Sequence, residues 1–136
     1  MKTSDKKQYK VIILDDDNFY AGLMKRQLEH YTYTLEVNND CKFKIEAYDN
    51  VNNCIDNVDR DTDLIFMDYY LSDSLSLDKV LQSIHLKNAT CKKIVISNKR
   101  NKETALNSLT IGADNFIQKD YYAFTRSCYM VEDLLN

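Results

Sequence analysis

The sequence contains no proline and only two glycines among its 136 residues. Proline and glycine usually mark turns, so asparagine and aspartate must take that role in this chain. The four cysteines lie far apart and form no Cys-x-x-Cys pair, and His30 and His85 stand apart from any cysteine cluster. The sequence therefore argues against a zinc site and predicts four free thiols.

Long apolar runs and an excess of charge of one sign are also missing. No run approaches the length that spans a membrane, and the first ten residues are polar and lysine-rich. With 18 basic and 21 acidic residues, the net charge of −3 argues against a nucleic-acid surface. We expect a single cytoplasmic domain over residues 1–136, with a polar lead-in at residues 1–8 and no output domain.

One short stretch joins a buried strand to a group of acids. The apolar run at residues 11–14 leads directly into Asp15, Asp16 and Asp17, and such a run is typical of a strand covered on both faces. At about 4 Å and an effective dielectric constant near 20, each pair of like charges costs on the order of 4 kcal/mol. Solvent, protonation, a helix N-terminus or a cation must offset that repulsion.

Four more strand patterns alternate with helical patterns along the chain. We expect strands at residues 9–14, 43–48, 64–67, 93–96 and 115–118. Asp16 or Asp17 can cap the first helix, which ends near His30 or Tyr31, and Asn50 or Asp49 can cap the second. The side chains expected to face the core from the five helices are Phe19, Leu23, Met24, Leu28 and Tyr31; Val51, Cys54, Ile55 and Val58; Leu77, Val80, Leu81 and Ile84; Ala105 and Leu109; and Phe124, Cys128, Val131 and Leu135.

The segment at residues 32–42 carries a less clear pattern. Tyr33, Leu35 and Val37 alternate as in a strand, and residues 38–40 resemble a turn. The sequence leaves two alternatives open here, a loop or a strand that forms a hairpin with the strand at 43–48. Cys41 and Cys91 are expected in loops.

Five strand–helix repeats predict an α/β fold, a doubly wound parallel sheet with helices on both faces. Ligands of such sheets bind at the carboxyl ends of the strands. The residues at those ends are Asp15, Asp16, Asp68, Ser97 and Lys119. Carboxylates suit Mg²⁺, while a lysine and a hydroxyl suit phosphate oxygens. The sequence thus predicts a site for Mg²⁺ and a phosphoryl group, with a carboxylate as nucleophile.

From Lys10 to Leu135 the chain resembles the receiver domain of two-component response regulators. The resemblance rests on the acidic pair after the first strand, on Asp68 after the third, on Ser97 after the fourth and on Lys119 after the fifth. It implies a flavodoxin-like (βα)5 sheet in the order 2-1-3-4-5. It also implies a phosphorylation-dependent signalling switch rather than an enzyme.

The resemblance implies a role for individual positions. Asp68 would accept the phosphoryl group from a sensor histidine kinase or phosphotransfer protein. The residues that would hold Mg²⁺ or Mn²⁺ are Asp15, Asp16, Asp68 and the backbone carbonyl of Tyr70. Ser97, Lys119 and the aromatic Phe116 would bind the phosphate or change position when the domain switches. Tyr70 and Lys99 would tune the lifetime of the phosphoryl group.

The implied partners are that kinase and a downstream output domain or protein, with no direct contact to nucleic acid or membrane. The output partner would bind a face made by the fourth helix, fifth strand and fifth helix. The resemblance leaves a homodimer open.

The sequence departs from the family pattern at two places. Asp120 follows Lys119 where the family usually has a proline, often with a cis bond. Since a cis bond without proline costs roughly 3–4 kcal/mol, we expect the Lys119–Asp120 bond to be trans. The proline and the Asp-Gly pair usual after the phosphorylated aspartate are also missing, and residues 72–76 stand there instead.

Two alternatives remain at the level of the sequence. Asp15 and Asp17 form the Asp-x-Asp of a haloacid-dehalogenase-like phosphatase, with Asp15 as nucleophile and Ser97, Lys119 and Asp120 as a loose match to its other motifs. That hypothesis leaves Asp68 unexplained. The other alternative is a pseudo-receiver, an interaction module that is never phosphorylated.

Overall fold

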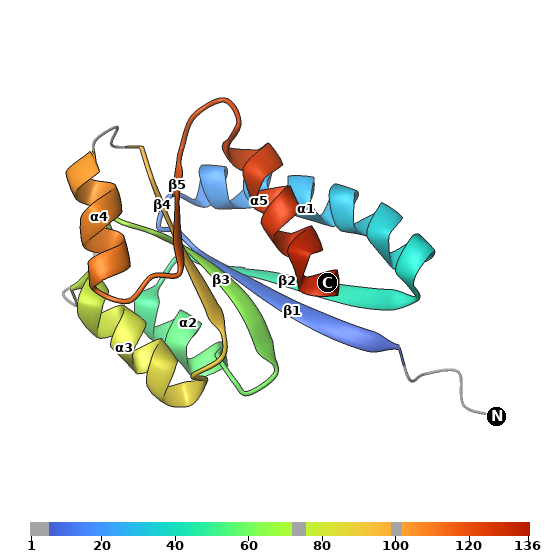
Figure 1. Ribbon diagram of the computed structural model, residues 1–136, viewed down its shortest axis with the longest axis horizontal. Helices are drawn as coiled ribbons and strands as arrows, with labels where there is room; N and C mark the ends of the chain where they lie inside the picture. The colour runs from blue at the N-terminus through green and yellow to red at the C-terminus, as the bar shows by residue number, and fades with distance from the viewer. Residues whose placement is uncertain (1–5, 72–75, 99–101) are drawn as a thin grey trace.

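The computed structural model describes residues 6–71, 76–98 and 102–136. Within them, strands and helices alternate along the chain as predicted (Figure 1). The elements are β1 (Lys7–Leu14), α1 (Asn18–Asn39), β2 (Cys41–Tyr48), α2 (Val51–Asn57), β3 (Thr62–Asp68), α3 (Leu77–Lys87), β4 (Lys92–Ser97), α4 (Lys102–Thr110), β5 (Asn115–Gln118), α5 (Ala123–Glu132) and a 3-10 turn (Asp133–Leu135). All paired strands are parallel and lie in the order β2-β1-β3-β4-β5, which confirms the predicted flavodoxin-like sheet.

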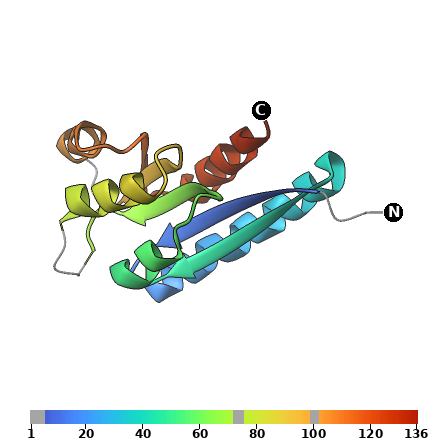
Figure 2. The ribbon, with the colours of Figure 1, turned by 90° about the horizontal axis from the view of Figure 1, so that it is seen from below.

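Alternate side chains of β1 divide the core into two layers. Val11 and Ile13 pack with the buried residues of α1 and α5, whereas Ile12 and Leu14 pack with those of α2 and α3. Figure 2 shows the long α1 running along one face of the sheet, beneath β1 and β2. Burial of both faces of β1 explains why its sequence is continuously apolar.

Helix α1 is much longer than predicted and includes residues 32–39 of the segment whose pattern was unclear. It runs to Asn39, and Asp40 closes it with a left-handed backbone (φ 48°). Thr32 and Leu35 are buried and continue the inward stripe of Met24 and Leu28. Both sequence alternatives for this segment, the loop and the hairpin strand, were therefore wrong. Burial of Thr32 and Leu35 on the inner face of the helix outweighs the strand-like alternation of apolar and polar residues in the local sequence.

Strand boundaries also differ from those predicted. β1 begins at Lys7, within the expected lead-in, because Lys7 and Gln8 pair with Cys41 and Lys42. β2 accordingly starts at Cys41, which lies in a strand rather than a loop.

Two helices present different residues to the core than predicted. Phe19 and Leu23 of α1 face solvent. In α4 the buried residues are Thr104 and Ser108, while Leu109 is exposed. The Ser108 hydroxyl donates a hydrogen bond to the carbonyl of Thr104 (2.8 Å), so burial leaves this hydroxyl satisfied within the helix.

Asparagine and aspartate do replace proline and glycine at turns. The Asn88 side chain donates to the carbonyls of Asp59 (2.9 Å) and Thr62 (2.8 Å), and its oxygen accepts from the Cys91 amide (2.9 Å). Asn50 caps α2 by accepting from the Asn53 amide, and Asp17 caps α1.

All four cysteines are free and buried, as predicted for the thiols. Burial raises the pKa of the Cys54 and Cys91 thiols to about 12. Separately, none of the helices in the described ranges is both long enough and apolar enough to cross a membrane.

Candidate functional site

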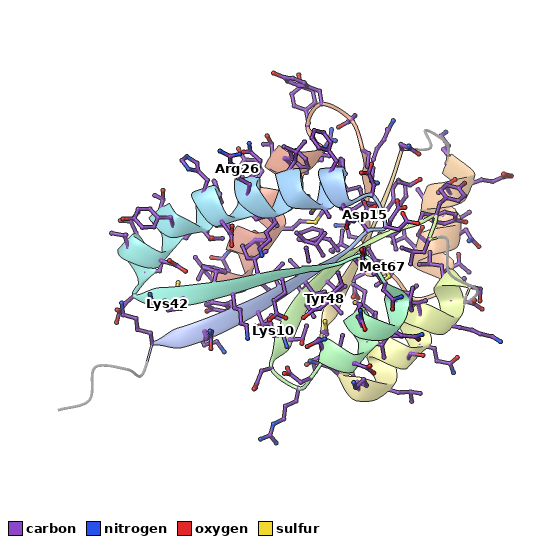
Figure 3. The ribbon with its side chains drawn as sticks, turned by 180° about the vertical axis from the view of Figure 1, so that it is seen from behind. Lys10, Asp15, Arg26, Lys42, Tyr48 and Met67 are labelled. Atoms are coloured by element: carbon purple, nitrogen blue, oxygen red, sulfur yellow. The ribbon has the colours of Figure 1, made fainter. Side chains whose placement is uncertain are left out.

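Three carboxylates meet where β1 and β3 end. Asp15 and Asp16 follow β1, and Asp68 is the last residue of the neighbouring β3. One oxygen from each carboxylate lies within 4.8 Å of the others. Figure 3 shows Asp15 at this edge of the sheet, near Met67, the residue before Asp68. Asp15 is 3% and Asp68 9% exposed, so two of the three acids are nearly removed from water.

Lys119 holds the two buried acids together from the end of β5. Its Nζ lies 2.8 Å from Asp15 Oδ2 and 3.2 Å from Asp68 Oδ1. The backbone amide of Lys119 donates to the carbonyl of Ser97 (2.7 Å), which fixes the lysine to the end of β4. One cation therefore offsets part of the carboxylate repulsion that the sequence analysis identified.

Burial and charge act in opposite directions on these groups. Burial raises the pKa of the Asp68 carboxyl to about 6; Lys119 opposes the rise, and Asp15 and Asp16 add to it. Burial alone would lower the pKa of the Lys119 ammonium. Its hydrogen bonds and charge interactions with Asp15 and Asp68 outweigh burial and raise that pKa above its ordinary value.

Tyr20, which the sequence analysis did not single out, also belongs to this site. The Lys119 ammonium lies 4.3 Å from the centre of the Tyr20 ring, and the same ring packs against Phe124 (5.2 Å between centroids). The Tyr20 hydroxyl is buried and has no hydrogen-bond partner among the described residues. Burial and the charges of Asp15, Asp68 and Asp120 raise its pKa. The only signal in the sequence was an aromatic residue in the first turn of the helix that follows the acids.

The other predicted site residues are placed as follows. Ser97 ends β4 and is fully buried. Phe116 lies half-buried in β5 and packs against the core layer of α2 and α3. Tyr70 lies two residues beyond β3 with its ring exposed. Lys99 and residues 72–75 lie outside the described residues.

The Lys119–Asp120 bond is trans, as predicted, because the described chain contains no cis peptide bond. Asp120 forms its own turn where proline would stand in the family pattern. Its carboxylate accepts from the Tyr122 amide (2.9 Å) and pairs with Arg126 of α5 (2.9 Å). An aspartate can therefore guide the chain from β5 into α5 without proline.

The donor set fits a hard divalent cation. Oxygen ligands on one or two carboxylates, completed by water and phosphate oxygens, are what Mg²⁺ prefers. Asp15, Asp16 and Asp68 offer such oxygens together. Beside them, Lys119 and Ser97 offer an ammonium and a hydroxyl of the kind that binds phosphate oxygens.

Comparison with known families gives one clear match. The model of the response regulator receiver domain matches residues 11–125 of this chain. Among curated proteins, no sequence matches it.

Solved structures show the same fold. A two-component response regulator from Clostridium difficile is 22% identical with a TM-score of 0.73, over 94% of this chain and 95% of that one. A CheY-like receiver domain protein from Methanospirillum hungatei JF-1 is 20% identical with a TM-score of 0.70, over 95% of this chain and 94% of that one. A response regulator from Burkholderia pseudomallei, described with a phosphorylated aspartic acid, a calcium ion and citrate, is 16% identical with a TM-score of 0.67, over 93% of this chain and 72% of that one.

Proposed function

Because this chain belongs to the response regulator receiver domain family, we propose that it is a signalling switch controlled by phosphorylation of Asp68. A sensor histidine kinase or a phosphotransfer protein donates the phosphoryl group in the cytoplasm. The domain assists only its own phosphorylation and dephosphorylation. The observation that carries the proposal is the pair of buried acids, Asp15 and Asp68, both held by Lys119 at the carboxyl edge of the sheet.

Asp68 is the nucleophile in this proposal. One of its carboxylate oxygens forms a bond to phosphorus while the bond from phosphorus to the donor histidine nitrogen breaks, and that nitrogen keeps the bonding electrons. The carboxylate must be ionised to attack, and its pKa of about 6 leaves it ionised at neutral pH. Lys119 lies 3.2 Å from this carboxylate, within reach of the oxygens of a phosphoryl group formed there.

Asp15, Asp16, Asp68 and the backbone carbonyl of Tyr70 would hold Mg²⁺ or Mn²⁺. When bound, the ion neutralises the carboxylates and the phosphoryl oxygens, which is most of what such phosphoryl transfer requires. The chain's own contribution is to keep the carboxylates together. Lys119 does this from β5, and the Asp17 amide donates to Asp15 Oδ1 (2.9 Å) and orients that side chain. The calcium ion and phosphorylated aspartic acid described for the Burkholderia relative support this assignment by analogy.

Signal output follows from contacts that differ between two states of the domain. Ser97 and Phe116 would shift when the phosphoryl group recruits the Ser97 hydroxyl. The affected surface is that of α4, β5 and α5, where Leu106, Leu109 and Tyr122 are exposed. A downstream output domain or protein is the expected partner of this face.

Intact-mass measurement after incubation with Mg²⁺ and acetyl phosphate or phosphoramidate tests the proposal. We expect a phosphate-sized gain that peptide mapping assigns to Asp68 and that the Asp68→Asn variant lacks. A gain on Asp15 would favour the phosphatase alternative, which the family match argues against. No gain in folded protein with Mg²⁺ present would favour the pseudo-receiver, a module that signals by binding alone.

A further inference from the structure

Helix α1 carries a second stripe of residues on the side that faces solvent. We call it the outer stripe, and its members are Phe19, Leu23, Arg26, His30, Tyr33 and Val37. Their spacing along the chain is 4, 3, 4, 3 and 4 residues, so that every two successive steps cover seven residues. That spacing is the heptad seam by which two α-helices pack in a coiled coil.

The outer stripe lies opposite the buried face of the helix. The buried residues of α1 are Ala21, Met24, Leu28, Thr32 and Leu35. At 100° per residue, the two stripes point in opposite directions. Figure 3 shows Arg26 on the outer side of α1, away from the sheet. The outer stripe is therefore not an extension of the core.

Large apolar side chains are unusual on such a face. Phe19 is 76%, Tyr33 69% and Val37 69% exposed, and Leu23 is 38% exposed. Single exposed apolar residues are common and carry no meaning. Here they form two pairs, Phe19 with Leu23 and Tyr33 with Val37, at the two ends of the outer stripe. Paired apolar side chains of this kind mark an interaction site.

The order of residues along the outer stripe indicates which partner would fit it. From either end it reads two apolar residues, two polar residues and two apolar residues. An antiparallel copy of the same helix therefore matches it layer by layer. Phe19 meets Val37 of the second copy, Leu23 meets its Tyr33, and Arg26 meets its His30. From these observations we propose that two copies of this chain pair through their α1 helices in antiparallel orientation.

The two orientations differ in the residue that each places against Arg26. Parallel helices would place Arg26 directly against Arg26 of the second copy. The antiparallel arrangement places Arg26 against His30 of the second copy. Glu29, the residue before that histidine, is exposed beside the seam and offers Arg26 an opposite charge. The arrangement is also two-fold symmetric, as expected for an interface between two identical surfaces.

The unexpected length of α1 is what makes this surface possible. If the helix ended at Tyr31, as the sequence alone suggested, the outer stripe would lose Tyr33 and Val37 and its symmetry. As it stands, the stripe spans about 27 Å of helix axis. One helix pair of this length buries less area than a standard interface, so we expect a dimer that forms at high and separates at low protein concentration.

Sedimentation velocity over a range from low micromolar to near millimolar protein tests the association. We expect the weight-average mass to rise toward that of two chains, and Leu23→Glu to keep it at one chain. Leu86→Glu is the matched control, because Leu86 is an equally large exposed residue (80%) on α3. Far-UV circular dichroism checks that both variants are folded. A wild type that stays at one chain throughout, or equal effects of both variants, would refute the proposal.

Disulfide trapping tests the orientation independently. The four native cysteines are buried, so introduced thiols on the outer stripe are the accessible ones. We expect the double variant Leu23→Cys with Tyr33→Cys to form a covalent dimer on mild oxidation, whereas each single variant does not. Efficient cross-linking of Leu23→Cys alone would mean a parallel pair and would overturn the antiparallel arrangement. Neither experiment requires Asp68 to be phosphorylated, so its outcome is independent of the proposed function.

Discussion

Replacing Asp68 by asparagine should make the domain more stable at neutral pH. The pKa of the folded Asp68 carboxyl is raised from 3.8 to about 6, chiefly by burial. Between these two pH values the folded chain therefore binds more protons at this residue than the unfolded chain does. Stability consequently falls as the pH rises through this window, and the whole penalty is present above about pH 6.

The size of the penalty follows from the displacement of the pKa. It amounts to about 3 kcal/mol, already reduced by the attraction of Lys119. An asparagine has the same shape and no charge, so Asp68→Asn removes the penalty and gains up to about 3 kcal/mol at pH 8. For a domain of this size, the midpoint of thermal unfolding would rise by roughly 10 °C.

Urea unfolding of wild type and Asp68→Asn at pH 4 and pH 8, without divalent cations, measures this difference. We expect a gain at pH 8 that disappears at pH 4. Asp56→Asn, at an exposed position on α2, serves as the control and should change stability by less than about 0.5 kcal/mol. Equal stability of wild type and Asp68→Asn at pH 8, or a gain that is the same at both pH values, would refute the reasoning.

Five further substitutions, at four positions, probe the surroundings of this carboxylate and the orientation of α1. Lys119→Met leaves two buried acids without their cation and should lower stability by about 3 kcal/mol at pH 8, less at pH 5; a pH-independent loss in urea unfolding would contradict the ion pairing. Tyr20→Phe removes a buried hydroxyl without a partner and should leave thermal stability unchanged or higher, whereas Tyr20→Leu also removes the ring under the ammonium and should lose about 1 kcal/mol or more. A clear loss in Tyr20→Phe would show that the hydroxyl is bonded. In dilute protein, Leu28→Ala should lower the free energy of unfolding by about 3 kcal/mol, whereas Leu23→Ala should lower it by less than about 0.5 kcal/mol. Similar losses for the two variants in chemical unfolding would mean that α1 does not face the sheet as described.

The sheet and its carboxyl edge could be predicted because their signals are local. Each central strand is a short apolar run that ends on a polar residue, and parallel strands bring those ends to one edge. Asp15, Asp68 and Lys119 therefore meet as expected, although 104 residues separate the first from the last.

The errors arise where the local pattern and tertiary packing disagree. Tyr33, Leu35 and Val37 alternate as in a strand, but only Leu35 is buried and the segment is helical. In α4 the core accepts Thr104 in place of the leucine that hydrophobicity would choose. Tyr20 could not be identified because its role depends on the position of Lys119, which comes from the other end of the chain.

The four buried thiols give the molecule a set of internal reporters. Each lies on a different part of the fold: Cys41 at the start of β2, Cys54 in α2, Cys91 just before β4 and Cys128 in α5. A thiol reagent reacts with thiolate, and burial both shields these sulfurs and disfavours their ionised form. Labelling must therefore wait until the surrounding element opens. The relative rates at the four positions rank the local openings of an edge strand, two helices and a central strand within a single unmodified protein.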